Sequence, residues 1–530
     1  MKNSHFILLS IGTSVLLSLP WLGWAPGCIL LLALLPLLIL EDEVKRQSPH
    51  NPHLFFNYAL LSFWLWHVIT VWWVVKITIA GILLLSLLNA ASMAFIWWLY
   101  HRAKLRFNTP FALMVLLSCW LGFEYWHYHR EIEWPWLNLG NGLASVPQMV
   151  QWYELTGVLG GSLWILLSNV LLYFAYKKGR RSGFNAAKGE LVLWFILVAV
   201  PLSWSYYRYH HYRETGKTLR VAVVQPNIDP FTQKFEGMSQ AEQYLYLVHL
   251  CDSVASPGTD YILGPETCLP DLLENQELAD NSFIHPFRER SRRNRNLKYI
   301  LGAITRKDFP GKSTAPEFGR WDNRQNCWYE LYNSAIQIDS SGVQLYHKSI
   351  RVAGVEKMPY EQYFSFLKNW SLNLGGTSGS LGRQTSPSLM ISPQALAAPV
   401  ICFESVFGEY LGQSVQKGAD VLFILTNDGW LTHASGYRQH LNLARLRAIE
   451  TRRSIARAAN TGISALIDQR GNIVQQSSWN KSTSLVGSIR VNREMTIYST
   501  FGDYIGRTAA FISVLLLLYL IGQSAIKSKK

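Results

Sequence analysis

At three places in the sequence, a residue that could take part in nucleophilic chemistry comes just after an apolar run or a turn. Glu266 comes just after the run DYILG, Lys348 comes shortly after a turn at 341–342, and Cys402 ends the run APVIC. Attack of a thiolate on an acyl carbonyl needs a base for the thiol proton and a donor for the developing oxyanion. A carboxylate can serve as the base and a lysine ammonium as the donor. Together these residues form a chemically complete set for acyl transfer.

Taken singly, each of the three residues has an ordinary structural explanation. A cysteine at the end of an apolar strand is usually a small buried hydrophobe. A glutamate or lysine in such a position is more often a surface charge or a member of an ion pair. The hypothesis of a catalytic site therefore depends on the fold bringing all three together.

The elements that must position these residues lie in the hydrophilic segment 208–507, whose pattern predicts a single α/β domain. Helical periodicity at 238–255 and 436–457 alternates with strand-like runs, and the Gly/Ser/Pro-rich stretch 371–398 predicts a loop. The strand-like runs are 219–225, 260–264, 298–304, 332–338, 398–402, 420–426 and 462–467. In open α/β sheets, ligand and catalytic groups collect at the carboxyl ends of the strands. The three candidate residues occupy such positions.

The rest of the chain is strongly apolar and predicts an α-helical transmembrane bundle of about eight helices. Most of the runs reach the roughly 20 residues that a helix needs to cross hydrocarbon. They are 5–22, 24–40, 54–75, 77–100, 110–126, 156–176, 189–207 and 508–526. A cleaved signal peptide would also explain residues 1–24, but no small-residue cleavage site follows, and further apolar spans do.

The distribution of Lys and Arg predicts the orientation in the membrane. With the N-terminus in the cytoplasm, the inside segments carry fourteen basic residues and the short outside loops carry only Lys76 and Arg130. Because basic residues gather in cytoplasmic loops, both termini are expected inside and the hydrophilic segment outside. The predicted domains are a membrane domain (1–207), a periplasmic catalytic domain (208–507), and a last helix with a basic tail (508–530).

Composition narrows the class of protein further. Hydrophobic residues make up 49% of the 530 residues. Charged residues make up 16%, whereas soluble proteins contain roughly 25% charged residues. The formal net charge of +14 would suit nucleic acid or an acidic membrane surface, and its concentration in the predicted inside loops favours the membrane. The six cysteines form no CxxC pair or Cys/His cluster, so neither a zinc site nor a disulfide framework is indicated.

The three motifs, in their order along the chain, resemble the nitrilase superfamily. They read GPET, YHKS and VICFES and follow the segment VVQPNI. The resemblance implies a four-layer α-β-β-α sandwich with Glu266 as general base, Lys348 as oxyanion-stabilising cation and Cys402 as nucleophile. It also implies supporting roles for Glu356, eight residues after the lysine, and for Glu404.

A nitrilase-like domain between seven helices and one resembles apolipoprotein N-acyltransferase, an enzyme family of the bacterial inner membrane. WPWLNLG (134–140) and LTGVLGG (155–161) are similar to membrane-domain motifs of that family; 134–140 is also typical of an interfacial aromatic anchor, and both interpretations can hold at once. The chain departs from the family pattern at Phe403, where Tyr is common, and at VAGVE (352–356), where a PFGE-like run is usual.

This resemblance implies a two-step exchange on lipid substrates. Cys402 takes an acyl chain from a membrane phospholipid, expected to be phosphatidylethanolamine, and passes it to the N-terminal amine of a diacylated apolipoprotein. No metal, diffusible cofactor or nucleic acid is implied. Since a lipid ester must reach the site from the bilayer, the loop after Lys348 and the pair Trp430-Leu431 are candidates for substrate binding, with Met358 and Phe364 foremost in the loop. These residues could equally pack the loop against the core of the domain.

Two alternatives remain open from the sequence. A nitrilase-type amidohydrolase could be membrane-anchored, although one helix would suffice for that. A transporter with an accessory domain should have ionisable residues within its spans. His67 and Glu124 are the few that occur, and a satisfied or interfacial residue is the simpler explanation of each.

Overall fold

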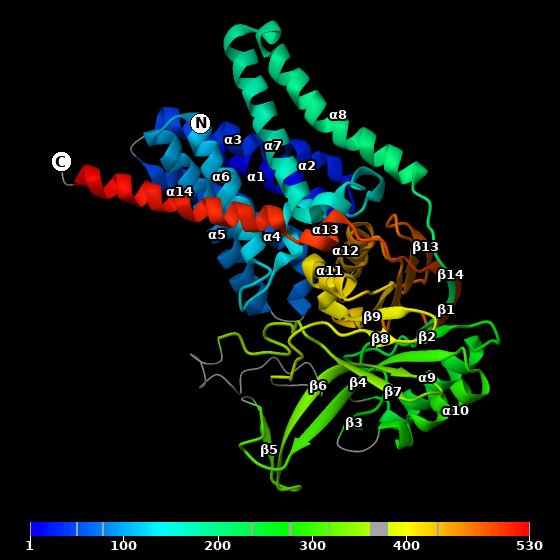
Figure 1. Cartoon of the computed structure of the whole chain (residues 1–530). Coiled ribbons are helices and arrows are strands. Elements are labelled where there is room, and N and C mark those ends of the chain that lie inside the picture. The colour runs from blue at the N-terminus through cyan, green and yellow to red at the C-terminus, as the bar shows by residue number, and fades with distance from the viewer. Residues whose placement is uncertain are drawn as a thin grey trace.

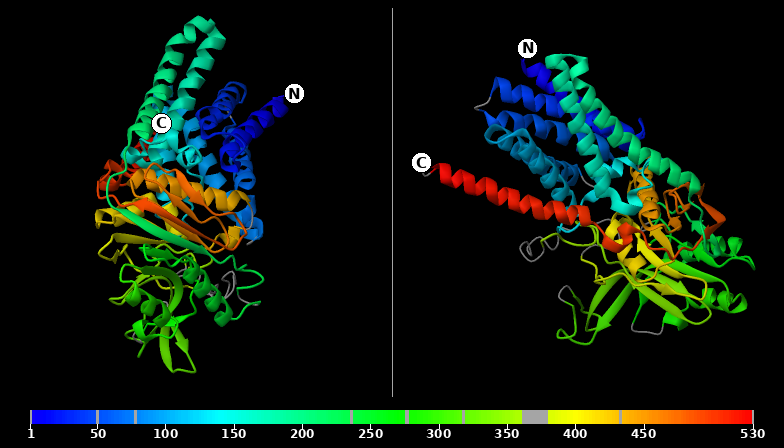
Figure 2. Two further views of the ribbon diagram at one scale, coloured as in Figure 1. Left: turned by 90° about the vertical axis from the view of Figure 1, so that its right-hand side faces the viewer. Right: turned by 45° about the horizontal axis from the view of Figure 1, so that its top comes forward.

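The structure is a computed structural model of the chain. The structure describes residues 2–48, 51–76, 79–234, 237–274, 278–316, 319–360, 380–431 and 434–528. A bundle of long helices lies on one side of the molecule and a pair of β-sheets on the other, and the C-terminal helix returns to the bundle (Figures 1 and 2).

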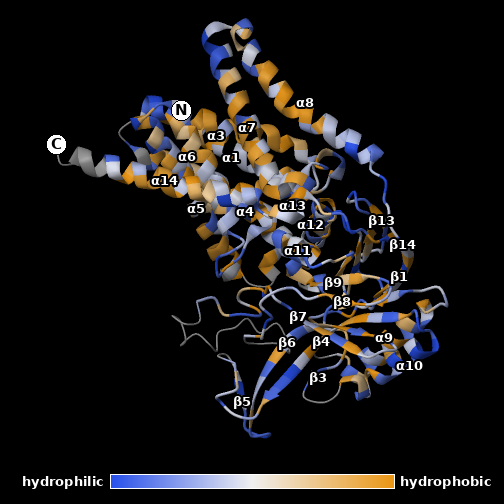
Figure 3. Cartoon of the chain, in the orientation of Figure 1, coloured by the Kyte–Doolittle hydropathy of each residue, from blue (hydrophilic) through white to orange (hydrophobic). Residues whose placement is uncertain are grey.

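Long apolar helices dominate residues 2–211 and return at the C-terminus. The long helices and the short ones that connect them are α1 (Lys2–Leu22), η1 (Gly27–Ile29), α2 (Leu30–Ala33), α3 (Leu35–Gln47), α4 (Pro52–Val71), η2 (Trp72–Lys76), α5 (Ile79–Arg106), α6 (Thr109–Trp126), α7 (Tyr153–Ser182), α8 (Lys188–His211) and α14 (Tyr504–Ser528). Within the described residues, six segments are long and apolar enough to cross a membrane: Asn3–Leu22, His53–Val75, Gly81–Arg106, Tyr153–Ser182, Phe184–His211 and Tyr504–Gln523. Apolar residues run along most of α7, α8 and α14, and the loop that joins α7 to α8 is polar (Figure 3). The expected helical bundle is confirmed.

Of the two other expected spans, 110–126 corresponds to α6, and 24–40 is divided among η1, α2 and α3. The division at Leu34 leaves backbone groups outside helical hydrogen bonding, which is costly away from water. Asn169 of α7 satisfies them, because its Oδ1 accepts from the Leu34 N–H at 2.8 Å and its Nδ2 donates to the Leu30 carbonyl at 2.8 Å. The short second span is therefore held by α7.

Residues 218–490 form two sheets. The first has the strand order β14-β1-β2-β4-β6-β5, with β3 paired to β4 and β7 paired to β6; the second has the order β13-β12-β11-β10-β9-β8. The strands are β1 (Thr218–Gln225), β2 (Tyr261–Leu263), β3 (Leu272–Leu273), β4 (Lys298–Phe309), β5 (Arg320–Asp322), β6 (Cys327–Ile338), β7 (Val343–His347), β8 (Met390–Ile391), β9 (Leu396–Ile401), β10 (Val421–Thr426), β11 (Ile455–Ala459), β12 (Ala465–Ile467), β13 (Ile473–Gln476) and β14 (Thr483–Arg490).

Alternation of side chains along the strands produces four layers. Val221 and Val223 of β1 pack between the two sheets with Phe423 of β10, and the intervening Ala222 and Val224 face a cluster that contains residues of α9 (Gln240–Val254) and α10 (His285–Arg293). On the second sheet, alternate residues of β10 face a cluster with α11 (Gly408–Gln416) and α12 (Ala434–Thr451). Because successive side chains of a strand point to opposite faces, this pattern confirms the α-β-β-α sandwich.

Two predicted elements differ from the structure. The helix predicted over 436–457 ends at Thr451, and residues 455–459 form β11, which pairs in parallel with β10. The Ala- and Arg-rich sequence there favours a helix locally, but every residue of β11 is buried in the sheet, so tertiary packing overrides propensity. The predicted loop 371–398 contains β8 and the start of β9; its residues 371–379 lie outside the described part.

The sandwich contacts the bundle mainly through α12 and α13 (Ile497–Phe501), both of which pack against α7. Gly157, in the LTGVLGG motif, has φ +64 and interrupts α7; a Cβ there would lie 2.2 Å from the Tyr498 ring. The helical turn after this kink begins at Val158, whose N–H donates to Glu450 Oε1 of α12 at 3.0 Å. A carboxylate of the sandwich thus caps a helix of the bundle.

Candidate active site

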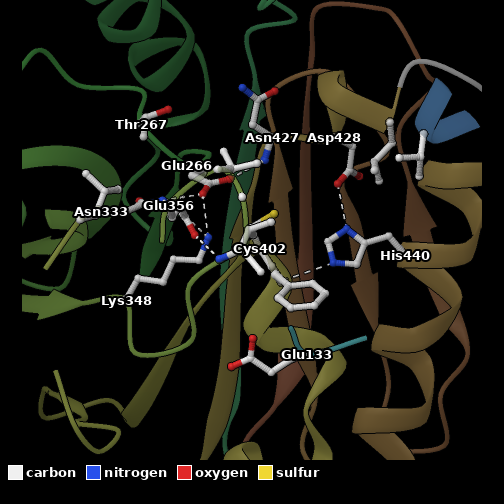
Figure 4. A pocket seen from close by; sticks show the side chains of 18 of the residues that line it. Glu133, Glu266, Thr267, Asn333, Lys348, Glu356, Cys402, Asn427, Asp428 and His440 are labelled. Carbon is white, nitrogen blue, oxygen red and sulfur yellow. Dashed lines mark hydrogen bonds and ion pairs between the residues drawn. The ribbon is translucent and has the colours of Figure 1, made fainter. Parts of the chain in front are cut away.

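The fold brings the three candidate residues of the sequence to one cavity at the ends of their strands (Figure 4). Glu266 follows β2, Lys348 directly follows β7, and Cys402 directly follows β9. The first two strands belong to one sheet and the third to the other. The cavity has a volume of ≈ 560 Å³.

Lys348 lies between two carboxylates. Its Nζ is 2.9 Å from Glu356 Oε1 and 3.4 Å from Glu266 Oε1. Burial alone would lower the pKa of this lysine, but the charges of Glu356 and Glu266 outweigh it and hold the pKa above its ordinary value. The ammonium therefore stays charged at neutral pH in a side chain that is only 2% exposed.

Asn333 completes this arrangement and was not singled out in the sequence. Its Nδ2 donates to Glu266 Oε1 at 2.7 Å and to Glu356 Oε1 at 2.9 Å, while the N–H of Asn427 donates to Glu266 Oε2 at 3.1 Å. Asn333 lies on β6 next to Lys348, whose N–H donates to the Asn333 carbonyl at 2.8 Å. The feature of the sequence that could have indicated Asn333 is its position as an asparagine within the apolar run 332–338.

Cys402 begins the 3-10 helix η9 (Cys402–Val406) with φ +50, a left-handed conformation that L-residues rarely adopt. Such backbone strain costs of order 1–3 kcal/mol and is found mainly at functional sites. Burial raises the pKa of the Cys402 thiol, Glu266 raises it further, and Lys348 acts in the opposite direction. The thiol is therefore protonated at neutral pH, and a nucleophilic role for it would require a base.

Both parts of the chain match families of known proteins. Residues 220–496 match the family described as carbon-nitrogen hydrolase, and residues 12–171 match the apolipoprotein N-acyltransferase N-terminal domain. The chain belongs to the carbon-nitrogen hydrolase family, among its apolipoprotein N-acyltransferases.

Curated relatives named apolipoprotein N-acyltransferase match this member of the family along most of their length. The protein of Chlorobaculum tepidum is 29% identical over 92% of this chain and 90% of its own. That of Gloeobacter violaceus is 26% identical over 96% and 92%, and that of Allorhizobium ampelinum is 30% identical over 70% and 66%. The similarity thus extends over the helices as well as the sandwich.

In this N-acyltransferase, Glu404 joins the two strand ends that carry Cys402 and Lys348. Its Oε2 accepts from the Ile401 N–H at 2.7 Å, and its Oε1 accepts from the Ser349 N–H at 2.6 Å. The Tyr346 hydroxyl donates to the same carboxylate at 2.8 Å. Burial raises the pKa of Glu404 to about 7, although the Ile401 and Ser349 N–H groups oppose the shift.

Replacing Glu404 with glutamine is expected to destabilise the site and slow acylation. An amide has one acceptor oxygen, so its NH₂ group would face either the Ile401 or the Ser349 N–H, and a buried donor would lose its partner. The expected cost is about 2 kcal/mol of unfolding free energy, seen as a lower Tm in detergent, together with slower acylation of Cys402. Glu289→Gln, on the surface of α10, is the control; a wild-type Tm and rate in Glu404→Gln would contradict the assignment.

The cavity has an apolar wall that belongs to the membrane helices, and the sequence did not predict it. Among its lining residues, Leu84, Leu85 and Leu88 come from α5, and Trp73 comes from η2. Residues of the 130s loop between α6 and α7, including Trp134 and Trp136, complete this wall. The cavity thus reaches from the three candidate residues to side chains of the bundle.

The four residues predicted to bind substrate are only partly described. Leu431 lines the cavity, and so do Val352, Val355 and Pro359 of the loop after Lys348. Met358 is half-buried within that loop. Phe364 lies outside the described residues, and Trp430 is described only in its backbone, in η10 (Asp428–Leu431). Substrate binding by this loop stays a prediction.

Proposed function

We propose that this protein transfers an acyl chain from a membrane phospholipid to the N-terminal amine of a diacylated apolipoprotein, through a thioester on Cys402. The observation that carries the proposal is the cavity itself, in which Glu266, Lys348 and Cys402 share one space with apolar side chains of membrane helix α5. Hydrolysis of small soluble amides would not require an apolar wall from a membrane helix. The names of the relatives support the lipoprotein acceptor.

In the first step, Glu266 takes the proton of the Cys402 thiol as Sγ attacks the ester carbonyl of the phospholipid. The C–S bond forms, and the carbonyl electron pair moves to oxygen, where the Lys348 ammonium stabilises the negative charge. Collapse of this intermediate breaks the C–O bond to glycerol. The departing alkoxide receives the proton held by Glu266, so lysophospholipid leaves and the thioester remains.

In the second step, the neutral amine of the diacylglyceryl-cysteine attacks the thioester carbonyl. The N–C bond forms, Lys348 again stabilises the oxyanion, and Glu266 takes the proton that the amine loses. The C–S bond then breaks, and the proton passes from Glu266 to the thiolate, which restores the resting enzyme. A thioester suits this exchange because it keeps the acyl group activated towards an amine. Phosphatidylethanolamine remains the expected donor.

Intact-mass measurement of the purified protein tests the covalent step. Incubation with phospholipid should add the mass of one acyl chain, and peptide mapping should locate it on Cys402. Hydroxylamine should remove the adduct, because it cleaves thioesters. Addition of a diacylated lipopeptide should also discharge it while the peptide gains the same mass. If turnover proceeds with no such adduct at any time, the proposed intermediate is wrong.

The proposed orientation has both termini in the cytoplasm and residues 208–507 in the periplasm, where the acceptor lipoproteins would be anchored. It depends on the fourteen basic residues of the proposed inside segments. A reporter active only in the cytoplasm should give a signal when fused to the C-terminus and none when inserted near residue 385. The reverse pattern would overturn the orientation.

The route of the lipid can be tested on α5. Moving an acyl chain fully into water costs about 0.8 kcal/mol per CH₂, so the chain should stay against apolar protein between the bilayer and Cys402. Gly81, Leu84, Leu85 and Leu88 follow one helical face and line the cavity. Leu85→Gln with Leu88→Gln is expected to slow acylation by long-chain phospholipid at least about 10-fold, while a soluble short-chain thioester reacts at nearly the wild-type rate.

Leu83 and Leu87 provide the matched control for this route. They belong to the same helix, are 48% and 46% exposed, and alternate with the cavity-lining positions. Changing both to glutamine should affect the two substrates alike. Equal losses on both substrates in the Leu85/Leu88 variant would mean that α5 supports the structure and does not deliver lipid.

A further inference from the structure

The strained backbone of Cys402 is held by side chains that the proposed mechanism does not use. The Cys402 carbonyl oxygen accepts a hydrogen bond from the Ser405 hydroxyl at 2.7 Å and lies 3.3 Å from His440 Nε2. The same His440 Nε2 is 2.9 Å from Ser405 Oγ. Because a peptide group is planar, fixing this carbonyl also fixes the direction of the Phe403 N–H and limits the positions that the Cys402 side chain can take.

His440 is itself fixed by a buried ionic pair. Its Nδ1 is 2.9 Å from Asp428 Oδ1, and Arg457 Nη2 donates to Asp428 Oδ2 at 2.6 Å. The side chains of Asp428 and Arg457 are fully buried, and that of His440 is 3% exposed. Burial opposes ionisation of Asp428, but Arg457 and His440 lower its pKa to about 2. The imidazole therefore has a permanent anion on one side and the nucleophile's backbone on the other.

The membrane domain reaches His440 through Trp136 of the WPWLNLG segment. The two rings lie 5.6 Å apart between centroids, and Trp136 Nε1 donates to Gln439 Oε1, on the preceding residue of α12, at 2.7 Å. Gln439 Nε2 in turn donates to the carbonyls of Trp21 and Thr70, at the ends of α1 and α4, at 3.2 and 3.1 Å. One amide thus joins two membrane helices and the tryptophan loop to α12.

The loop that carries Trp136 is anchored within the bundle. Glu124 Oε1 of α6 accepts from the Leu139 N–H at 2.8 Å, and the Gly140 N–H donates to Ser162 Oγ of α7 at 2.9 Å. Trp136 is only 3% exposed. The loop therefore has a fixed position relative to the helices, and it does more than anchor aromatic rings at an interface.

We propose that Trp136 and His440 are positioning residues for the nucleophile, so that the membrane domain contributes to the chemical step at Cys402 as well as to lipid binding. Trp136 and Gln439 hold α12 against the bundle, α12 holds His440, and His440 with Ser405 holds the Cys402 carbonyl. The inference rests on the proposed role of Cys402. This role would explain the 134–140 motif, which no step of the proposed mechanism uses.

The test uses the full-length enzyme in detergent and a short-chain, water-soluble thioester as acyl donor, which avoids any need for lipid delivery. Single-turnover acylation of Cys402 is followed by intact mass over a range of donor concentrations. His440→Leu is expected to lower the limiting rate by about 10-fold or more and to leave the half-saturating concentration within about 2-fold, because misplacement of a reacting group affects the rate of the step. His440→Gln, whose side-chain amide can still hydrogen-bond to Ser405 or to the Cys402 carbonyl, should recover most of the rate.

Trp136→Leu should cause a similar loss in the limiting rate, and Trp136→Phe a smaller one. The double variant of His440→Leu and Trp136→Leu should be no slower than the slower single variant, since both changes act through the same contact. Trp152→Phe is the control, because Trp152 is another buried tryptophan of the membrane domain and its Nε1 donates to Met149 within the bundle.

Several results would overturn the inference. Multiplicative losses in the double variant would mean that the two residues act independently. A wild-type limiting rate in Trp136→Leu, with a defect only on long-chain phospholipid, would assign Trp136 to lipid delivery. No rescue by His440→Gln would also count against it. If His440→Leu fails to fold, Trp136→Leu, Trp136→Phe and His440→Gln decide the question. Absence of acylation in the wild-type enzyme would instead overturn the proposed function.

Discussion

Replacing Cys402 with alanine or with serine is expected to abolish N-acylation and to leave the protein folded in the membrane. Alanine removes the nucleophile, and serine offers an alcohol that Glu266 cannot activate as readily as a thiol. The loss should be at least about 10³-fold, the scale seen when a catalytic nucleophile is removed. Acylation of a diacylated lipopeptide measures it, and the Tm in detergent reports folding.

The other cysteines provide the comparison for this experiment. Cys327, at the start of β6, lies outside the cavity lining, so Cys327→Ala should keep nearly full activity. Cys268 is less suitable as a control, because it lines the cavity beside Glu266, which the sequence did not indicate. Near-normal turnover in Cys402→Ala would remove Cys402 from the mechanism.

Replacing Lys348 with alanine is the second change for which a large loss is expected. It removes the cation that would stabilise the oxyanion, and it leaves Glu266 and Glu356 bridged by the Asn333 amide without the positive charge that Lys348 places between them. We expect acyl-enzyme formation to slow by roughly 100-fold or more, the usual scale for loss of an oxyanion donor. Single-turnover transfer to Cys402 is the measurement.

Lys348→Arg should rescue little of this activity. The ammonium fits between two carboxylate oxygens at 2.9 and 3.4 Å in a buried site, and a planar guanidinium cannot reproduce that compact geometry. Lys417→Ala, at the exposed residue that directly follows α11, controls for the loss of a positive charge. A wild-type rate of acyl-enzyme formation in Lys348→Ala would exclude Lys348 from the site.

Much of the architecture could be predicted from local patterns in the sequence. Apolar runs of about 20 residues identify membrane helices because hydrocarbon thickness sets their length. Buried strands such as β10 and β1 are recognisable as short apolar runs. The three motifs could be placed at the ends of strands for the same reason, since a residue that directly follows a strand must lie at its end, but their distribution over two sheets could not be predicted. These properties depend on residues within one element.

The sequence was least informative where the structure depends on contacts between distant segments. Nothing near residue 457 shows that β11 will pair with β10, so the sequence pattern predicts that the helix α12 continues six residues beyond Thr451. Strand β14 pairs with β1 across more than 250 residues and has no distinctive local pattern. Pairing with a distant strand decides such elements, and tertiary packing overrides their intrinsic propensity.

The candidate site divides in the same way. By itself the sequence could indicate Glu266, Lys348 and Cys402 as candidates, because their chemistry and their positions after strands are local properties. Only the tertiary structure decided that Asn333 bridges two carboxylates, that leucines of α5 line the cavity, and that Trp136 covers His440 some 300 residues along the chain. The physical reason is that hydrogen bonds and packing contacts depend on how whole elements come together, and the periodicity of a single element carries no information about its partner.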